Sequence, residues 1–150
     1  METPPPARLA QDLRVNRLIW TAVAAGVVIL TTVLTYLAST RAEPPASDLA
    51  VLFYVNAALS MGAIGAGFWM QRTLTEALPK AGTYEEAALL IRTRGIVSIA
   101  VMEASALFAA VATYVTGELI NLAFVLPFFA FLALFFPTEA RYTFLLGHRR

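Results

Sequence analysis

Four long stretches of hydrophobic residues alternate with shorter polar segments along the chain. The hydrophobic stretches are residues 18–38, 49–70, 95–116 and 119–136. A helix needs about 20 mostly apolar residues to cross the hydrocarbon layer of a bilayer, and each stretch is close to that length. The pattern therefore predicts an all-α integral membrane protein, in which four spanning helices form one four-helix bundle with antiparallel up-down connections.

The overall composition agrees with a single membrane domain. Of the 150 residues, 59% are hydrophobic and only 14% are charged, whereas soluble domains are nearer half apolar and a quarter charged. Arg14 and Arg17 precede the first stretch, as basic residues precede the hydrophobic region of a signal peptide. The stretch is too long for such a region, so we expect a retained spanning helix.

The basic residues are distributed very unevenly between the polar segments. Ten of the eleven Lys and Arg residues lie before the first stretch, in the segment 71–94 or after the fourth stretch, and Arg41 alone lies elsewhere. Cytoplasmic loops of membrane proteins carry an excess of Lys and Arg. The sequence therefore predicts that both termini and the loop 71–94 lie in the cytoplasm, with the spans in a bacterial inner membrane.

The connections between the stretches also carry local signals. Gly117 and Glu118 are the whole turn between the third and fourth stretches, so we expect these two helices to be antiparallel neighbours. Thr83 followed by Glu86 has the pattern of a capping box. This pattern predicts a helix over 84–94 that continues into the third span.

Proline residues predict two further features. Pro127 is expected to kink the fourth helix. Three consecutive prolines near the start of the chain predict that residues 1–7 are extended or disordered, and the segment Pro79–Gly82 is expected to break the helix that follows the second stretch.

Several kinds of chemistry are not expected from this sequence. There is no Cys, which excludes disulfides, thiolate metal sites and cysteine nucleophiles. The single histidine, His148, is too close to the end of the chain to join a bis-histidine haem or a zinc site. No catalytic pairing or phosphate-binding loop is present, and a net charge of +1 gives no nucleic-acid footprint. We therefore expect no enzyme activity, cofactor, metal or nucleic-acid partner.

Glu103 is the charged residue that lies deepest in a predicted span. It is eight residues inside the third stretch, about 12 Å from the cytoplasmic surface at 1.5 Å per residue. No Lys or Arg lies in another span, and an ionised carboxylate in hydrocarbon is costly, so we expect a protonated acid. Two interpretations remain open: a structural acid that fastens helices, or a carboxyl that binds and releases a proton or a cation.

Small residues at the same depth predict close helix packing around Glu103, because they let helices approach each other in lipid. They are Ala100, Ala106 and Ala110 in the third stretch, and Gly62, Gly65 and Gly67 in the second. Ser60 lies at a matching depth and is a candidate hydrogen-bond partner for Glu103. Glu103 and Ser60 are therefore the candidate proton or ion site.

Residues 94–108, Arg-Gly-Ile-Val-Ser-Ile-Ala-Val-Met-Glu-Ala-Ser-Ala-Leu-Phe, resemble the second helix of the proteolipid c subunit of rotary ATP synthases. In that family a carboxylate in mid-helix carries the proton and is often followed by Ala. The preceding helix is glycine-rich, as residues 62–67 are here. The resemblance covers residues 52–115, and it implies a hairpin with a cytoplasmic loop and Glu103 as the ion-binding carboxyl.

The chain as a whole also resembles a group of small bacterial four-span proteins to which no function is assigned. The shared features are an acid followed by Ala-Leu-Phe, here Glu103 and residues 106–108, then Thr-Gly at 116–117 and Pro-Thr at 137–138. This second resemblance supports the architecture and implies no activity.

The sequence thus favours a non-enzymatic membrane protein with a c-subunit-like hairpin, as a homo-oligomer or an accessory component of a larger membrane complex. The alternative is a small proton-coupled transporter acting as a dimer, because small multidrug exporters also have four spans and one essential membrane Glu.

Overall fold

The protein is almost entirely helical. The computed structural model describes residues 6–41 and 50–147, and these ranges contain no strand. The elements are α1 (Pro6–Ser39), α2 (Ala50–Ala77), the 3-10 helix η1 (Leu78–Lys80), α3 (Tyr84–Thr116), the 3-10 helix η2 (Leu119–Val125), α4 (Leu126–Phe135) and α5 (Glu139–Gly147). The predicted all-α class is confirmed.

Three of these helices, α1, α2 and α3, are long and apolar enough to cross a membrane. α3 has 33 residues, which at 1.5 Å per residue gives about 50 Å. The hydrocarbon core of a bilayer is only about 30 Å thick. In a bilayer, part of each long helix would therefore extend beyond the hydrocarbon.

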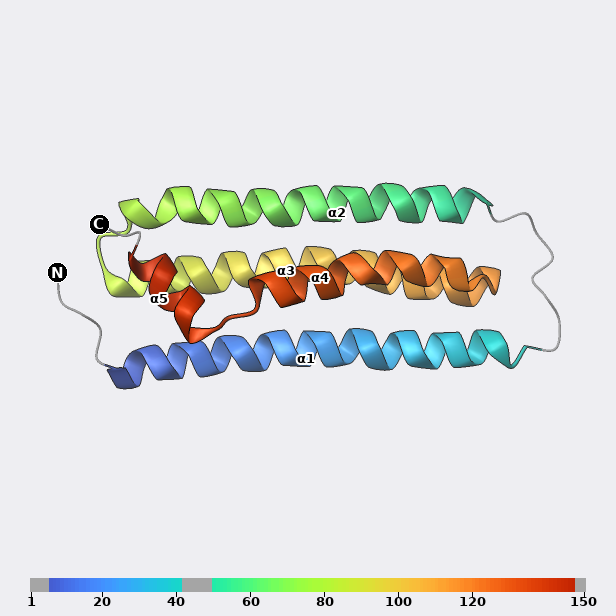
Figure 1. The fold of residues 1–150 in the computed structure, drawn as a ribbon, viewed down its shortest axis with the longest axis horizontal. Helices are drawn as coiled ribbons and strands as arrows, with labels where there is room; N and C mark the ends of the chain where they lie inside the picture. The colour runs from blue at the N-terminus through green and yellow to red at the C-terminus, as the bar shows by residue number, and fades with distance from the viewer. Residues whose placement is uncertain (1–5, 42–49, 148–150) are drawn as a thin grey trace.

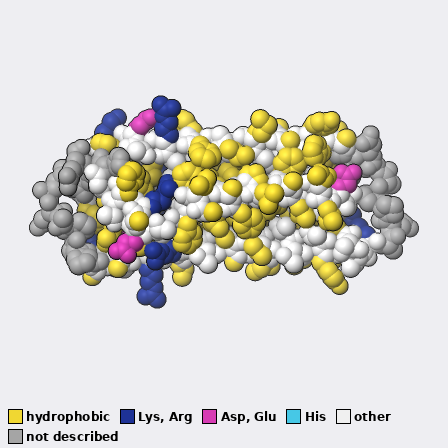
Figure 2. Space-filling model, in the orientation of Figure 1, with side chains coloured by type: hydrophobic (Ala, Val, Ile, Leu, Met, Phe, Trp, Pro, Cys, Tyr) yellow, Lys and Arg dark blue, Asp and Glu magenta, His cyan; other side chains and the backbone are white. Residues whose placement is uncertain are grey.

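Most of the described charged side chains lie at one end of the molecule. α1 begins, α2 connects to α3 and α5 ends at this end (Figure 1), which we call the basic end. The Lys and Arg side chains visible in Figure 2 cluster mostly there, and hydrophobic side chains cover the middle. The opposite end, where α3 turns into η2, is the far end. The described segments that the sequence analysis identified as rich in Lys and Arg lie together at the basic end. That this end faces the cytoplasm stays a prediction.

α3 is the central helix of the bundle. It packs against α1, α2, η2 and α4, while α1 and α2 lie on opposite sides of it (Figure 1) and touch each other at most marginally. Members of the main hydrophobic core come from all of these long elements and include Trp20, Val27, Ala63, Ile99, Met102, Ala106, Val125, Phe128 and Phe131. Each outer helix therefore buries its apolar side chains mainly by packing against α3.

The predicted fourth span is not one regular helix. Residues 119–125 form the 3-10 helix η2, and the α-helix begins only at Leu126. Pro127 lies in the first turn of α4, where its missing N–H costs nothing, whereas inside a longer α-helix it would remove a backbone hydrogen bond. A break after Phe135 then turns α5 by 68°. The predicted span 119–136 is thus corrected to a 3-10 helix followed by a short α-helix.

Helix boundaries follow local capping signals where these exist. The Thr83 hydroxyl accepts a hydrogen bond from the Glu86 N–H at 3.2 Å, and the Glu86 carboxylate accepts one from the Thr83 N–H. The predicted capping box is therefore confirmed, as is the continuous helix into the third stretch. α3 ends at Thr116, and the capping residue Gly117 has a φ of 73°, the left-handed conformation that glycine adopts without strain.

Two predicted boundaries change. α1 begins at Pro6, because proline is well suited to the first position of a helix, so the expectation of an extended chain is wrong for residues 6 and 7. Residues 1–5 lie outside the described ranges. α2 continues past residue 70 to Ala77, and η1 with Pro79 follows, as the expected break at this position requires.

Only part of the predicted small-residue packing is present. A Cβ on Gly67 would lie 3.0 Å from Phe131 Cε2 and 3.5 Å from Met102 Cγ, so this glycine is a true close-packing position. Gly62 and Gly65 are exposed, and a Cβ on either would meet no atom within 4 Å. The prediction is therefore wrong for these two glycines, because they lie on the outer side of α2.

The same division holds on α3. Ala106 and Ala110 are fully buried, as predicted. Ala100 is exposed, because it projects from the side of α3 that faces neither α2 nor α4.

Replacing Gly67 with Leu is expected to destabilise the protein by about 1–3 kcal/mol, the usual cost of overpacking, because Phe131 and Met102 leave no room for the side chain. Thermal unfolding of the purified protein in detergent measures the change. Gly65→Leu is the matched control and should leave the unfolding midpoint nearly unchanged. Equal effects of the two substitutions would contradict the packing described here.

Candidate functional site

Glu103 projects from α3 toward the side of α1, at the edge of the packed region. Its side chain is partly exposed, between the buried Met102 and the exposed Ala104. Along the bundle axis, Glu103 lies in the middle of the apolar belt, the region between the two ends that hydrophobic side chains cover. Trp20 of α1 packs beside Gly95, and α1 and α3 run in the same direction (Figure 1), so Glu103 lies level with residue 28, near the centre of the first stretch.

The Glu103 carboxylate has no hydrogen-bond or ion-pair partner among the described residues. This distinguishes it from every other polar side chain at the same depth on α3. Ser105, two residues further on, is buried and bonded. An acid at the middle of an apolar belt is therefore left to interact with something outside the described chain.

Ser60 does not approach Glu103. Its hydroxyl instead forms a hydrogen bond of 2.9 Å with the hydroxyl of Ser105. Residues two apart on a helix project about 200° apart, so Ser105 faces α2 while Glu103 faces the α1 side. The predicted Glu103–Ser60 pair is therefore not formed, although both residues lie at the predicted depth.

A shallow groove follows the outer seam of α2 and α3 at this depth. Its volume is about 410 Å³, and its lining includes Gly62, Ala104 and Ser105. The lining is almost entirely apolar, and Glu103 does not belong to it. The groove on the α2 side and the acid on the α1 side are therefore separate features.

A buried polar cluster at the far end was not predicted. Asn56 and Asn121 are both fully buried, and the Asn56 amide donates to Asn121 Oδ1 at 3.4 Å. The Asn121 amide donates to the Thr116 hydroxyl at 3.1 Å and to the Glu118 carbonyl at 3.3 Å. The signal available in the sequence was the presence of two asparagines, at similar depth, in stretches that are otherwise apolar.

Further hydrogen bonds continue along the seam between α2 and α3 toward the basic end. The Gln71 amide donates to the Ser98 hydroxyl at 3.3 Å, and that hydroxyl donates to the Arg94 carbonyl at 2.7 Å. The Arg94 guanidinium donates to the Thr73 hydroxyl. Together with Ser60–Ser105, these bonds fix the rotation of α2 against α3.

Ion pairs at the basic end attach α1 to α3. Arg92 bonds Asp12 at 2.9 Å, and Arg8 bonds Glu85 at 2.6 Å. The Tyr84 hydroxyl donates to the second oxygen of Asp12 at 2.9 Å. Burial, together with this hydrogen bond to Asp12, raises the pKa of Tyr84 to about 12. Exposed pairs of this kind contribute little energy individually, so their main effect is to set the position of α1.

No group of three or more metal-binding side chains occurs in the part of the chain that the structure describes. Comparison with known proteins found no matching family, no matching curated protein and no matching solved structure.

Replacing Asn121 with Leu is expected to lower the free energy of unfolding by about 1 kcal/mol, a typical value for a hydrogen bond between membrane helices, because Asn56 then loses the one side-chain partner it has among the described residues. Unfolding in detergent measures the loss. The double variant Asn56→Leu/Asn121→Leu should recover part of it, since no buried amide is left unpaired. A double variant with the summed loss of both single variants would contradict this pairing.

The raised pKa of Tyr84 predicts a loss of stability at alkaline pH. The folded protein favours the neutral phenol, so this contribution is complete below pH 10, the ordinary pKa of tyrosine, and is lost as the pH rises to about 12. Ultraviolet absorbance of wild type minus Tyr84→Phe should show phenolate forming near pH 12. A difference step near pH 10 would show that the bond to Asp12 does not form.

Proposed function

We propose that the chain is a non-enzymatic integral membrane protein of the bacterial inner membrane, with four spans and both termini in the cytoplasm. Three long apolar helices support membrane insertion, and the bent η2–α4 and α5 segment would supply the fourth span. The clustering of basic residues at the end where α1 begins and α5 ends supports the orientation. Within this protein, the hairpin of α2 and α3 would present Glu103 as a protonatable carboxyl.

The observation that carries this proposal is the position of Glu103. The carboxyl lies at mid-depth of the central helix, partly exposed, with no described partner. A carboxylate that only fastened helices would be expected to point into the bundle and bond a neighbour, as Ser105 does. A charged side chain at the centre of a bilayer is costly, so in this proposal the carboxyl interacts with a proton or with an external partner.

The uncovered side of α3 supports an oligomeric or accessory role. Within residues 95–116, its exposed residues are small or β-branched: Val97, Ala100, Ala104, Val111 and Val115. Small residues allow another helix to approach closely in lipid, and Glu103 lies at the edge of this strip. In the family that the hairpin resembles, the carboxyl likewise lies on an outer, accessible face. A second copy of the chain or another subunit of a membrane complex would therefore meet the acid here.

Labelling by an apolar carbodiimide tests the proposal, because the reagent attacks a protonated carboxyl that is reachable from lipid. Native membranes containing the full chain should show specific labelling of Glu103 that declines as the pH rises. Glu103→Gln should abolish the labelling, since an amide does not react. Glu118→Gln, which removes a carboxylate at the far end instead, is the matched control and should leave the labelling unchanged.

An absence of labelling at any pH would overturn the proposal, provided that Glu103→Gln is as stable as wild type. That result would make Glu103 an enclosed structural acid. The alternative of a dimeric proton-coupled transporter predicts one further effect, because a transported substrate would compete with protons: added substrate would release protons from the wild type and not from Glu103→Gln.

A further inference from the structure

Arginines from the three long helices lie at one level of the bundle. The Arg94 guanidinium of α3 donates to the hydroxyl of Thr73, the residue after Arg72 of α2. On α1, Arg17 comes less than one turn before Trp20, whose indole packs beside the glycine that follows Arg94. Arg17, Arg72 and Arg94 therefore form one layer across the bundle.

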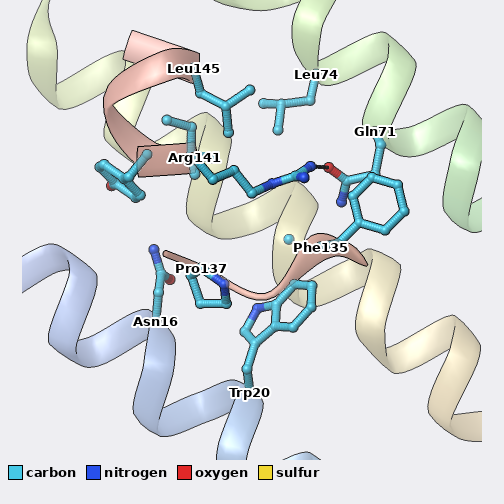
Figure 3. Close-up of a pocket in the computed structure, with 11 residues that line it drawn as sticks. Asn16, Trp20, Gln71, Leu74, Phe135, Pro137, Arg141 and Leu145 are labelled. Atoms are coloured by element: carbon cyan, nitrogen blue, oxygen red, sulfur yellow. Dashed lines mark hydrogen bonds between the residues drawn. The ribbon is translucent and has the colours of Figure 1, made fainter. Parts of the chain in front are cut away.

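Arg141 of α5 adds a fourth arginine to this layer. Figure 3 shows its side chain reaching across toward Gln71 of α2. The guanidinium donates to Gln71 Oε1 and to the Leu134 carbonyl of α4, each at 3.1 Å. Because Gln71 directly precedes Arg72 in α2, the two arginines lie at the same level. We call Arg17, Arg72, Arg94 and Arg141 the arginine layer.

A second hydrophobic core lies beyond the arginine layer, on the side of the basic end. In Figure 3, Leu145 of α5 faces Leu74 of α2 across this core. Its buried members all lie beyond the arginine layer, whereas those of the main core all lie on the other side of that layer. They are Leu13, Leu74, Leu78, Ala81, Ala87, Ile91, Tyr142 and Leu145. We call residues 6–16, 73–93 and 138–147, which enclose this core, the cap.

The surface of the cap is charged. Arg8 pairs with Glu85, and both side chains are more than half exposed. Glu76 and Lys80 are exposed as well. Water drives apolar side chains together into a closed core, whereas lipid supplies no such force between helices. A charged surface around a separate apolar core is therefore the arrangement expected of a part that water surrounds.

Tyrosines mark a second level, toward the far end. Each long helix carries one, Tyr36, Tyr54 or Tyr114, at 18 to 20 residues from its arginine of the layer. At 1.5 Å per residue this is about 27–30 Å, close to the roughly 30 Å of a hydrocarbon layer. Tyr36 and Tyr54 are 66% and 71% exposed, and exposed tyrosines are typical of membrane–water interfaces. Between the two levels, Glu103 is the one charged residue of these helices.

η2 and α4 together span the same distance. η2 has 7 residues and α4 has 10. With a rise of about 2.0 Å per residue in a 3-10 helix and 1.5 Å in an α-helix, their combined length is about 29 Å. A continuous α-helix of these residues would reach only about 25 Å. The 3-10 form of η2 therefore lengthens a short crossing to match the other three helices, and α5 then belongs to the cap.

We propose that the hydrocarbon layer of a bilayer fills the space between the arginine layer and the three tyrosines, and that the cap projects from it into water as a folded unit. In α3, the cap extends from Tyr84 to the arginine layer, which gives it a height of about 15 Å. This inference rests on the membrane insertion proposed above. It adds the level of each membrane border and a second, water-surrounded core.

Cysteine accessibility tests the borders, because the chain contains no cysteine of its own. Single-cysteine variants of the full chain are treated with a membrane-impermeant maleimide, in intact cells and in inverted membrane vesicles. Glu76→Cys, beyond the arginine layer, is expected to react from one side of the membrane only. Val51→Cys, beyond the tyrosines, is expected to react only from the other side. Met61→Cys, at an exposed position between the borders, should react from neither side.

Two pairs of variants test whether the cap is folded. Leu78 is fully buried in the second core, whereas Lys80 is exposed. Leu78→Cys should react about tenfold or more slowly than Lys80→Cys, because its reaction requires a local opening, and denaturant should abolish the difference. Ala87→Cys and Leu89→Cys are the second pair, buried and exposed on α3. The small change at Ala87 keeps the test valid if Leu78→Cys loosens the core.

Equal reaction rates within both pairs would overturn the folded cap. Protection of Glu76→Cys from both sides, or reaction of Met61→Cys, would overturn the borders when Val51→Cys still reacts only from the far side. A different result would remove the proposed function itself: Glu76→Cys, Met61→Cys and Val51→Cys all reacting from the same side would show that α2 does not cross the membrane.

Discussion

Hydrogen bonds along the seam between α2 and α3 hold the structure in register. Apolar contacts alone define helix rotation weakly in a bilayer, because lipid tails are as apolar as leucine. The bonds between Ser60 and Ser105 and between Gln71 and Ser98 therefore define how α2 faces α3. Since α1, η2 and α4 also pack on α3, this rotation determines which residues of α3 remain uncovered, including Glu103.

The two ends of the bundle differ from its middle in whether polar side chains have bonding partners. At the basic end, Asp12 pairs with Arg92, and at the far end Asn121 bonds Asn56 and Thr116. In the apolar middle of the bundle, Glu103 has no described partner, although in a bilayer the energetic penalty for an unpaired charge would be greatest there. The arrangement thus leaves one acid without a described partner, between two ends where carboxylates and amides are bonded.

Features that depend on a few neighbouring residues could be predicted from the sequence. The capping box of Thr83 and Glu86, the turn at Gly117 and the grouping of basic segments all belong to this class. Rotations about a helix axis could not be predicted, because they depend on partners distant in the chain. Ser60 therefore has the predicted depth but a different partner, and Gly62 lies outside the packing. The inward direction of Arg141 likewise depends on the bend before α5.

The marginal contact between α1 and α2 has a consequence for biogenesis. Helices enter the membrane in the order of their synthesis, and the first two leave the ribosome well before the third. Without α3 they have almost no surface to share, so no stable helical hairpin can form from them alone. In the proposed membrane protein, assembly during translation would therefore wait for the third helix, and until then α1 and α2 would be open to insertion chaperones or to mispairing with other membrane proteins.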